Sequence, residues 1–277
     1  MTFARHLEII LDARMIMHSG IGSHIRGLLE GWREIAPDFR PTLLGDPEAI
    51  EESGGRFGPR HVITFRAPIY GLREQTAFPA KACRGKLLHC PHYNVALRHR
   101  GPLVVTLHDL IHIHEQWGVP SAWKRMYGRW MLRKAVRRAG HIFTVSHCTA
   151  GEIAERLKVD REKISVAYNA PSRLFREADP SPEAVAQFRR KCELPARYLL
   201  TVGLYKPHKN LDRLLEALHS LWREGDLSSP LVMAGVQAKD RPALEARIAS
   251  LDLGDRARVL DRLPAEDLPL LYAERMP

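Results

Sequence analysis

Cysteine is scarce and widely spaced in this chain. The sequence contains Cys83, Cys90, Cys148 and Cys192, with no C-x-x-C pair and no zinc-ligand spacing. Disulfide scaffolds and zinc-finger modules are therefore excluded, because both need closely spaced cysteines. Scattered thiols packed as small apolar groups are typical of a reducing compartment, so we expect a cytoplasmic protein.

Long apolar runs are also absent. The hydrophobic content of 45% is ordinary for a globular chain, but no run approaches the length of a membrane span. Residues 1–14 hold only the short apolar run 9–11, which predicts neither a signal peptide nor a membrane anchor. Low-complexity segments and solenoid repeats are missing as well. At 277 residues, two globular domains are expected.

Acidic residues are fewer than basic ones, 32 against 42, which gives a formal charge of +10. Nucleic acid would be a natural partner for such a chain. The sequence contains no nucleic-acid-binding motif, however, so we do not expect nucleic acid to bind. The basic residues are densest in a helix predicted over 123–138, around Trp123 and Trp130. Two interpretations stay open for this helix: peripheral contact with anionic lipid at the inner face of the cell membrane, or a solvated and partly buried helix face.

Short apolar runs alternate with helical patterns, which is typical of a parallel α/β sheet. Six runs predict the strands of a first domain: 8–11, 61–65, 86–89, 103–107, 142–145 and 164–167. Three more predict those of a second: 198–202, 231–234 and 258–260. We expect the first helix to be capped by Ser23. The expected domains are 1–175 and 197–277, joined by a linker with a short helix at 176–196.

The segment after Tyr198 combines a strand predicted to be buried on both faces, a glycine at Gly203 and a Leu-rich amphipathic helix from Leu211. Asn210 is a good N-cap for that helix. Lys209 then lies beside free backbone N–H groups at the positive end of the helix dipole, where anions such as phosphate bind. A solvated charged loop is the alternative interpretation from spacing alone.

Several further motifs follow in order along the chain. They are Asp12-Ala-Arg14, Gly20-Ile-Gly22, His89-Cys-Pro-His-Tyr-Asn94, Val104-Val-Thr-Leu-His108-Asp109-Leu110, Thr144-Val-Ser146 and Ile164-Ser-Val-Ala-Tyr-Asn169. Together with the Gly203 to Asn210 loop they resemble the retaining family 4 glycosyltransferases, over roughly residues 9–272. The resemblance implies the GT-B architecture, with two Rossmann-like, doubly wound parallel-sheet domains. It also implies transfer of a hexose of the mannose or glucose type, with retention, from a nucleoside diphosphate sugar to a glycan or lipid-linked acceptor in polysaccharide or lipopolysaccharide biosynthesis.

The same resemblance assigns roles to residues. His108 and Asp109 are the catalytic candidates, and His108 also follows the strand 103–107, at the end where open α/β sheets place their ligands. The alternative is that His108 is a structural histidine whose hydrogen bonds are satisfied within a loop. The donor diphosphate is expected to contact Gly20, Gly22, Gly203, Lys206, Lys209 and Asn210. The acceptor side is expected to involve His92, Tyr93 and Asn94.

No cofactor and no metal are expected, because no carboxylate cluster accompanies the histidine pairs that could begin a metal site. Those pairs are His112 with His114 and His89 with His92. The resembling enzymes continue past the helix at 267–272 into a further strand and a pair of glutamates that hold the donor. This chain ends at Pro277, so we expect an incomplete second domain and impaired transfer. A non-catalytic remnant that binds an acceptor, lipid or protein partner through its N-terminal domain is the alternative function.

Overall fold

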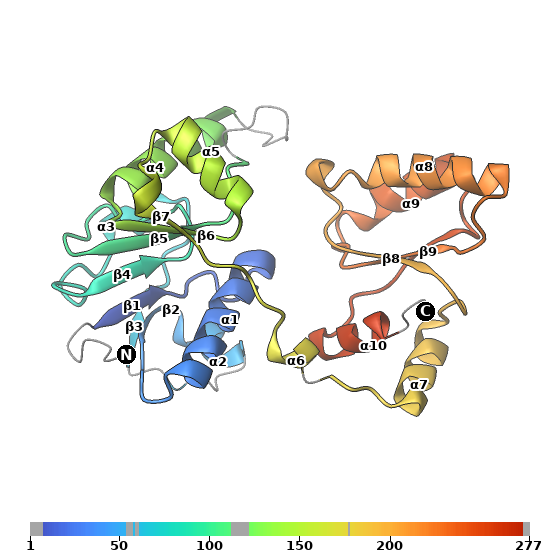
Figure 1. Ribbon diagram of the computed structural model, residues 1–277, viewed down its shortest axis with the longest axis horizontal. Coiled ribbons are helices and arrows are strands. Elements are labelled where there is room, and N and C mark those ends of the chain that lie inside the picture. Colours follow the sequence, from blue (N-terminus) through green and yellow to red (C-terminus); the bar gives the residue numbers. More distant parts are fainter. Residues whose placement is uncertain (1–7, 54–57, 59–60, 112–121, 177, 274–277) are drawn as a thin grey trace. The chain divides into compact units, whose positions relative to one another are not determined.

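The computed structural model describes residues 8–53, 58, 61–111, 122–176 and 178–273. The chain divides into two compact units, 1–172 and 173–277. Each unit is a parallel sheet with helices on both faces (Figure 1). The predicted α/β class with two doubly wound domains is therefore confirmed.

The first unit is built on a seven-stranded parallel sheet in the order β3-β2-β1-β4-β5-β6-β7. Its strands are β1 (Ile9–Asp12), β2 (Thr42–Gly45), β3 (His61–Thr64), β4 (Leu87–Cys90), β5 (Leu103–Leu107), β6 (His141–Thr144) and β7 (Ile164–Val166). The strand order reverses between β1 and β4, and this switch point is where open α/β sheets bind their ligands.

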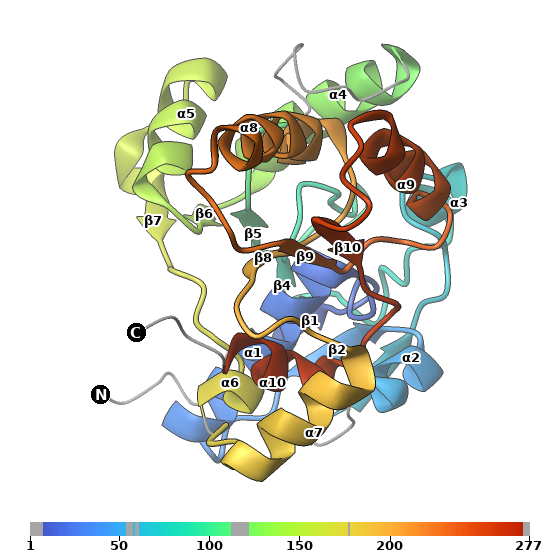
Figure 2. The same cartoon turned by 90° about the vertical axis from the view of Figure 1, so that its right-hand side faces the viewer.

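Helices cover both faces of this sheet because successive side chains of each buried strand point to opposite faces. They are α1 (Ser19–Ile35), α2 (Pro47–Glu52), α3 (Leu72–Thr76), α4 (Ala122–Arg138) and α5 (His147–Leu157). Leu11 of β1 packs in one core with Ile25 of α1, whereas its neighbour Ile10 packs in another with Met131 of α4. Figure 2 shows α1 and α2 on one side of the strands and α4 and α5 on the other.

The second unit is a three-stranded parallel sheet in the order β10-β9-β8. Its strands are β8 (Leu199–Val202), β9 (Leu231–Ala234) and β10 (Ala257–Val259). Its helices are α6 (Arg173–Arg176), α7 (Pro182–Cys192), α8 (Leu211–Glu224), α9 (Arg241–Ser250) and α10 (Leu268–Tyr272). One core lies between the sheet and α8 with α9, and another between the sheet and α7 with α10.

Three details differ from the sequence-based expectations. The predicted Ser23 cap is wrong: α1 begins at Ser19, and the Ser23 hydroxyl donates to the Ser19 carbonyl inside the helix. β8 is not buried on both faces, because it lies at the edge of its sheet and leaves Val202 37% exposed. The segment expected as a linker includes α7, whose Phe188 is buried with Val232 in the second unit's core.

Candidate functional site

The carboxyl ends of β1, β4 and β5 lie side by side at the switch point of the first sheet. Asp12 ends β1, the loop with His92 follows β4, and His108 follows β5. Residues far apart in the sequence thus gather at one edge, because parallel strands all end on the same side of their sheet.

His108 is half-buried and its ring is fixed in one orientation. The Nε2 atom lies 3.0 Å from the carbonyl oxygen of Pro91. Since a carbonyl only accepts hydrogen bonds, Nε2 carries the proton and Nδ1 is left as an acceptor. Burial lowers the pKa of His108, and the neighbouring His24 lowers it further, against the opposing effects of the Pro91 carbonyl and Asp109. Asp109 is exposed, and its Oδ1 accepts from the Ile111 backbone N–H at 3.0 Å.

His24 is a member of this site that sequence reasoning missed. Its ring meets that of His108 edge-on, with the centroids 4.7 Å apart. The Nδ1 atom lies 3.0 Å from Oδ1 of Asn169, while Nε2 is buried with no hydrogen-bond partner among the described residues. Burial lowers the pKa of His24. The sequence feature that could have indicated His24 is its position one helical turn after Gly20.

Gly20 and Gly22 lie within the first turn of α1 and not in a loop before it. A Cβ atom on Gly22 would lie 2.3 Å from the carbonyl oxygen of Ile16, so only glycine lets the helix pack against the preceding loop. Gly20 has no atom within 4 Å of such a position. Gly22 is therefore a packing glycine, and contact of either residue with a diphosphate stays a prediction.

The three predicted acceptor-side residues differ in accessibility. Asn94 is 3% exposed, donates from Nδ2 to the carboxylate of Glu74 and accepts from the Tyr127 hydroxyl at 3.2 Å. Tyr93 is 6% exposed and its ring lies 3.9 Å from that of His92. His92 is the half-buried member of the three. In this structure Asn94 holds its neighbours in place, and the contact of these residues with an acceptor stays a prediction.

A buried ion network lies beneath this loop. Arg14 binds Asp12 through two nitrogens, at 2.9 and 2.6 Å, and its Nη1 lies 2.8 Å from Oε1 of Glu74. Glu74 is fully buried, and that burial raises its pKa against the opposing effects of Arg14 and Asn94. Sequence reasoning missed Glu74, because α3 has only five residues and its partners, Arg14 and Asn94, lie in the loops after β1 and β4.

The predicted donor loop lies in the second unit, after β8. Gly203 donates its backbone N–H to the Ala234 carbonyl at 2.8 Å, and Lys206 forms a 2.9 Å ion pair with Asp240. Lys209 is exposed and ends a 3₁₀ turn, Pro207–Lys209. Asn210 occupies the N-cap position of α8, but its left-handed backbone, with φ at 57°, leaves its side chain without a capping hydrogen bond. The predicted side-chain cap is therefore wrong, because capping side chains act from an extended backbone.

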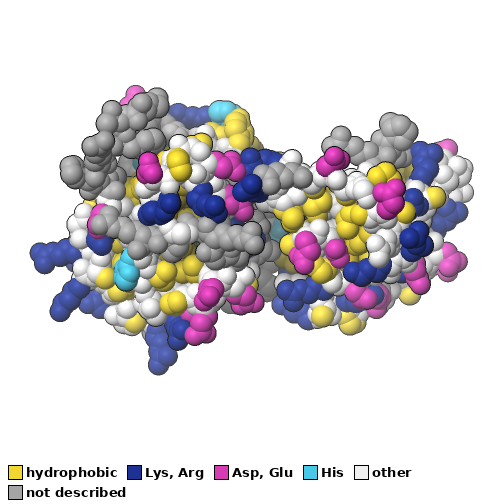
Figure 3. Space-filling model, turned by 90° about the horizontal axis from the view of Figure 1, so that it is seen from below, with side chains coloured by type: hydrophobic (Ala, Val, Ile, Leu, Met, Phe, Trp, Pro, Cys, Tyr) yellow, Lys and Arg dark blue, Asp and Glu magenta, His cyan; other side chains and the backbone are white. Residues whose placement is uncertain are grey.

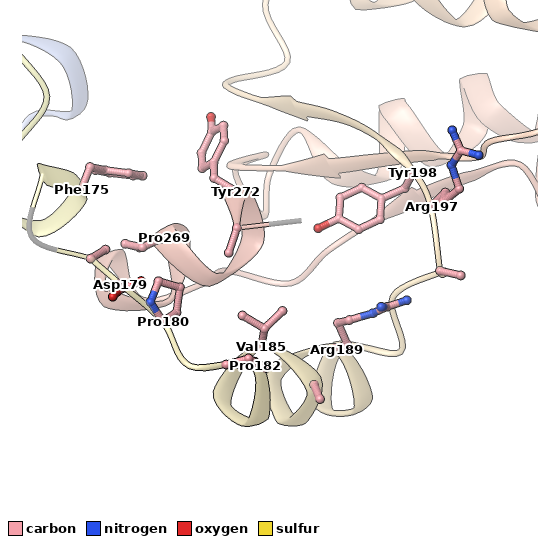
Figure 4. A pocket seen from close by; sticks show the side chains of 14 residues that line it. Phe175, Asp179, Pro180, Pro182, Val185, Arg189, Arg197, Tyr198, Pro269 and Tyr272 are labelled. Atoms are coloured by element: carbon pink, nitrogen blue, oxygen red, sulfur yellow. The ribbon is translucent and has the colours of Figure 1, made fainter. Parts of the chain in front are cut away.

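A separate hollow with mixed apolar and charged lining lies near the start of β8 (Figure 4). Phe175, Tyr198, Tyr272 and Pro269 line it, and the Tyr198 hydroxyl donates to the Leu271 carbonyl at 2.8 Å. Tyr198 precedes β8, whereas the donor loop follows it. Because parallel sheets bind ligands at the carboxyl ends of their strands, this hollow is not the donor site.

Metal ligands do not gather in the part of the chain that the structure describes: no group of three His, Cys, Asp or Glu residues is placed to hold an ion. Nε2 of His89 is hydrogen-bonded to the Thr106 hydroxyl, at 2.8 Å. His112 and His114 lie outside the described residues. The expected independence from metal stays a prediction.

Two family descriptions match the chain. Residues 19–170, more than half of the chain, match Glycosyltransferase Family 4, and residues 186–275 match Glycosyl transferases group 1. These two matches correspond closely to the two structural units.

Individual relatives agree. The O-antigen chain mannosyltransferase RfbU of Salmonella typhimurium is 27% identical over 68% of this chain, which spans 47%, about half, of that relative. Among solved structures, sucrose-phosphate synthase of Thermosynechococcus elongatus superposes with a TM-score of 0.65 at 16% identity, covering 97% of this chain and 73% of that one. The lipopolysaccharide glycosyltransferase WaaG gives a TM-score of 0.63 at 14% identity, covering 96% and 72%. The chain therefore belongs to Glycosyltransferase Family 4 and has the GT-B type of fold.

Proposed function

We propose that this chain transfers a hexose of the mannose type from a nucleoside diphosphate sugar to a glycan or lipid-linked acceptor, with retention of configuration, in lipopolysaccharide or related polysaccharide assembly. The name of the Salmonella relative supports the mannose type and the pathway class. The observation that carries the proposal is the position of His108, which follows β5 at the switch point of the first sheet and has its ring fixed by the Pro91 carbonyl.

The reaction breaks the bond between the anomeric carbon and a diphosphate oxygen and forms one between that carbon and the acceptor oxygen. The acceptor proton passes to the departing diphosphate, so atoms and charge balance. Positive charge develops on the sugar ring in the transition state. A neutral His108 beside that ring does not oppose this charge, whereas an imidazolium would.

We assign the leaving diphosphate to Lys209 and not to Lys206. Lys206 already pairs with Asp240 at 2.9 Å, while Lys209 is exposed at the turn that leads into α8. The first N–H groups of α8 have no partner within the helix and add to the cationic character of this end. Lys209 is therefore the cation best placed to meet an incoming phosphate.

Calorimetric titration with GDP and UDP tests this assignment. Lys209→Ala is expected to weaken nucleotide binding by about tenfold to a hundredfold, the effect of losing one charge-assisted contact. Lys206→Ala is the matched control from the same loop and should weaken it much less. Equal effects of the two substitutions would remove Lys209 from the diphosphate site.

Turnover tests the reaction itself. His108→Ala is expected to lower kcat for transfer from GDP-mannose or a UDP-hexose on the order of a hundredfold. His61→Ala, an exposed histidine at the amino end of β3, is the control and should retain full activity. Nucleotide binding without any transfer would favour the alternative, a binding module without catalysis. We also propose that no divalent metal takes part, so activity should persist in excess EDTA.

We further propose that α4 rests on the surface of an anionic membrane. Its exposed stripe carries Trp123, Met126 and Trp130, 68, 57 and 43% exposed, together with the exposed cations Arg133 and Lys134. Exposed tryptophans beside cations suit the interface of an anionic bilayer. Among the described residues, no helix is long and apolar enough to cross a membrane. On the face shown in Figure 3, Lys and Arg side chains are interspersed with Asp and Glu. Such mixed charge suits an anionic surface less well than the exposed stripe of α4.

Sedimentation with phosphatidylglycerol-containing vesicles tests the membrane proposal. Arg133→Glu/Lys134→Glu is expected to abolish binding, because each cation near an anionic surface is worth about 1 kcal/mol. The control, Lys158→Glu/Arg161→Glu, makes the same charge change at exposed positions outside α4 and should bind like the wild type. Binding that the α4 substitutions leave intact would contradict the proposal.

A further inference from the structure

Tyr70 has a strained backbone at the rim of the first unit's site. Five non-glycine residues described in the structure have positive φ, and four of them, Lys158, Glu193, Asn210 and Asp252, lie at helix ends, where a left-handed residue is common. Tyr70, with φ at 66°, instead precedes Gly71, the N-cap of α3. A bulky residue in this conformation is an outlier, and such strain concentrates at functional sites.

The buried network beneath Tyr70 holds this strained conformation in place. The Tyr70 backbone N–H donates to Oε2 of Glu74 at 3.2 Å. Glu74 is itself fully buried and fixed by Arg14 at 2.8 Å and by the Asn94 amide. The backbone at Tyr70 is therefore determined by an ion pair and a hydrogen bond that would be costly to break.

The Tyr70 side chain is presented to solvent within an aromatic cluster. The residue is 46% exposed, and the rings of His92, Tyr93 and Tyr127 lie around its ring with centroids 6.1, 6.2 and 6.3 Å away. His92 and Tyr127 meet Tyr70 nearly edge-on, at 82° and 80°. They support the ring from its sides, which fixes its orientation and leaves part of its surface open.

This cluster has the chemistry of a saccharide platform. A pyranose ring has an apolar C–H face that packs on an aromatic ring and hydroxyl groups at its edge that bond to polar tips. Here the hydroxyl of the exposed Tyr70, 3.4 Å from that of the buried Tyr93, and the half-buried His92 supply those tips. Arg14, which holds Glu74 beneath the cluster, has a side chain that is only 5% exposed and already paired, so an uncharged sugar fits better than a phosphate.

We propose that Tyr70 is a binding residue for the acceptor, on which the acceptor's terminal sugar ring stacks beside His92. The inference rests on the proposed transferase function and specifies its acceptor subsite. The donor sugar carries a diphosphate, whereas this cluster presents aromatic rings and hydroxyls, and the Arg14 beneath it is already paired with Glu74. We therefore assign the stacked sugar to the acceptor.

Three variants at Tyr70 separate its ring from its backbone. Tyr70→Gly removes the ring and relieves the strain, so it should melt at a higher temperature than Tyr70→Ala, while acceptor affinity falls about tenfold in both variants. Tyr70→Phe keeps the ring and should retain most of the affinity. Tyr70→Ala removes the ring but keeps the strain. Lys158→Gly is the matched control, because it relieves a left-handed residue of φ 55° far along the chain and should leave saccharide binding unchanged.

The first readout is binding of an α-linked mannose disaccharide, followed by saturation-transfer NMR and titration. The second is the KM for the acceptor, compared with that for the donor, where transfer occurs. Disaccharide binding that depends on the Tyr70 ring supports the inference even if no transfer is seen, which would count against the proposed function alone. Transfer with an unchanged acceptor KM in Tyr70→Gly would overturn the inference and leave the function standing. Failure of the wild type to bind the disaccharide at millimolar concentration would also overturn it.

Discussion

His89 is a buried histidine in β4 whose protonation state is set by its surroundings. It is 6% exposed, and burial together with the nearby His24 lowers its pKa from 6.5 to about 4. Its hydrogen bond to the Thr106 hydroxyl satisfies the neutral ring. The folded protein therefore holds His89 uncharged at a pH where the unfolded chain would protonate it.

The consequence is a pH-dependent stability with a defined sign. Between pH 6.5 and about 4 the unfolded chain binds more protons at this residue, so its contribution to stability is complete above 6.5 and is lost as the pH falls. The loss should reach about 3 kcal/mol, at about 1.4 kcal/mol per pKa unit. Urea unfolding across this range should show a flatter pH profile for His89→Gln than for the wild type. Parallel profiles would mean that His89 titrates normally.

The two glycines of α1 should respond oppositely to the same substitution. Gly22→Ala places a methyl group 2.3 Å from the Ile16 carbonyl oxygen, and overpacking of this kind costs about 1–3 kcal/mol. Gly20→Ala meets nothing within 4 Å and improves the helix propensity of α1. Chemical denaturation should therefore show a destabilised Gly22→Ala and a neutral or stabilised Gly20→Ala. Equal effects would contradict the packing role of Gly22.

At the scale of elements, β8 is an apolar edge strand that pairs with β9 on one side and with no other described strand. Val202→Lys is expected to slow aggregation measured by light scattering, because a charge on an edge strand blocks pairing with another chain. Leu221→Lys on α8 is the control: Leu221 is 39% exposed against 37% for Val202, but its backbone lies within a helix. If both substitutions slow aggregation equally, exposed apolar area and not the strand edge drives it.

The elements themselves could largely be predicted from the sequence. The runs 103–107 and 231–234 form the strands β5 and β9 with those bounds, because a buried parallel strand needs a continuous apolar run. β2 was missed, since Thr42–Gly45 is a four-residue segment ending in glycine. The start of α1 was misplaced because serine is a residue type that often caps helices. In the structure α1 instead begins at Ser19, and Gly22 packs against the Ile16 carbonyl.

The candidate site was predictable only where a strand end marks it. His108 could be found because it directly follows β5. His24 could not, because its partner Asn169 is 145 residues away in the sequence and its unpaired Nε2 is a property of the folded chain. Tyr70 and Glu74 escaped for the same reason: strain and burial arise from tertiary contacts that no local pattern encodes.

At the scale of the whole molecule, each hydrophobic core lies within one of the two units. Unfolding is therefore expected to proceed in two steps. Leu132→Ala, in α4, should lower the free energy of unfolding of the first unit by about 2–5 kcal/mol and leave that of the second unchanged. Leu244→Ala, in α9, should have the opposite pattern. Calorimetry resolves the two steps. A single transition that both variants shift equally would show that the units unfold as one.

The ion network of Asp12, Arg14 and Glu74 has a consequence for how this chain can diverge. Each member neutralises another in a buried setting, so a single change leaves an uncompensated charge and only concerted changes are tolerated. Tyr70 is joined to this network through its backbone N–H, so its ring can be exchanged without removing that hydrogen bond. New sugar preferences can therefore arise by exchanging the ring at position 70 through single substitutions, whereas the ion network beneath it tolerates only concerted changes.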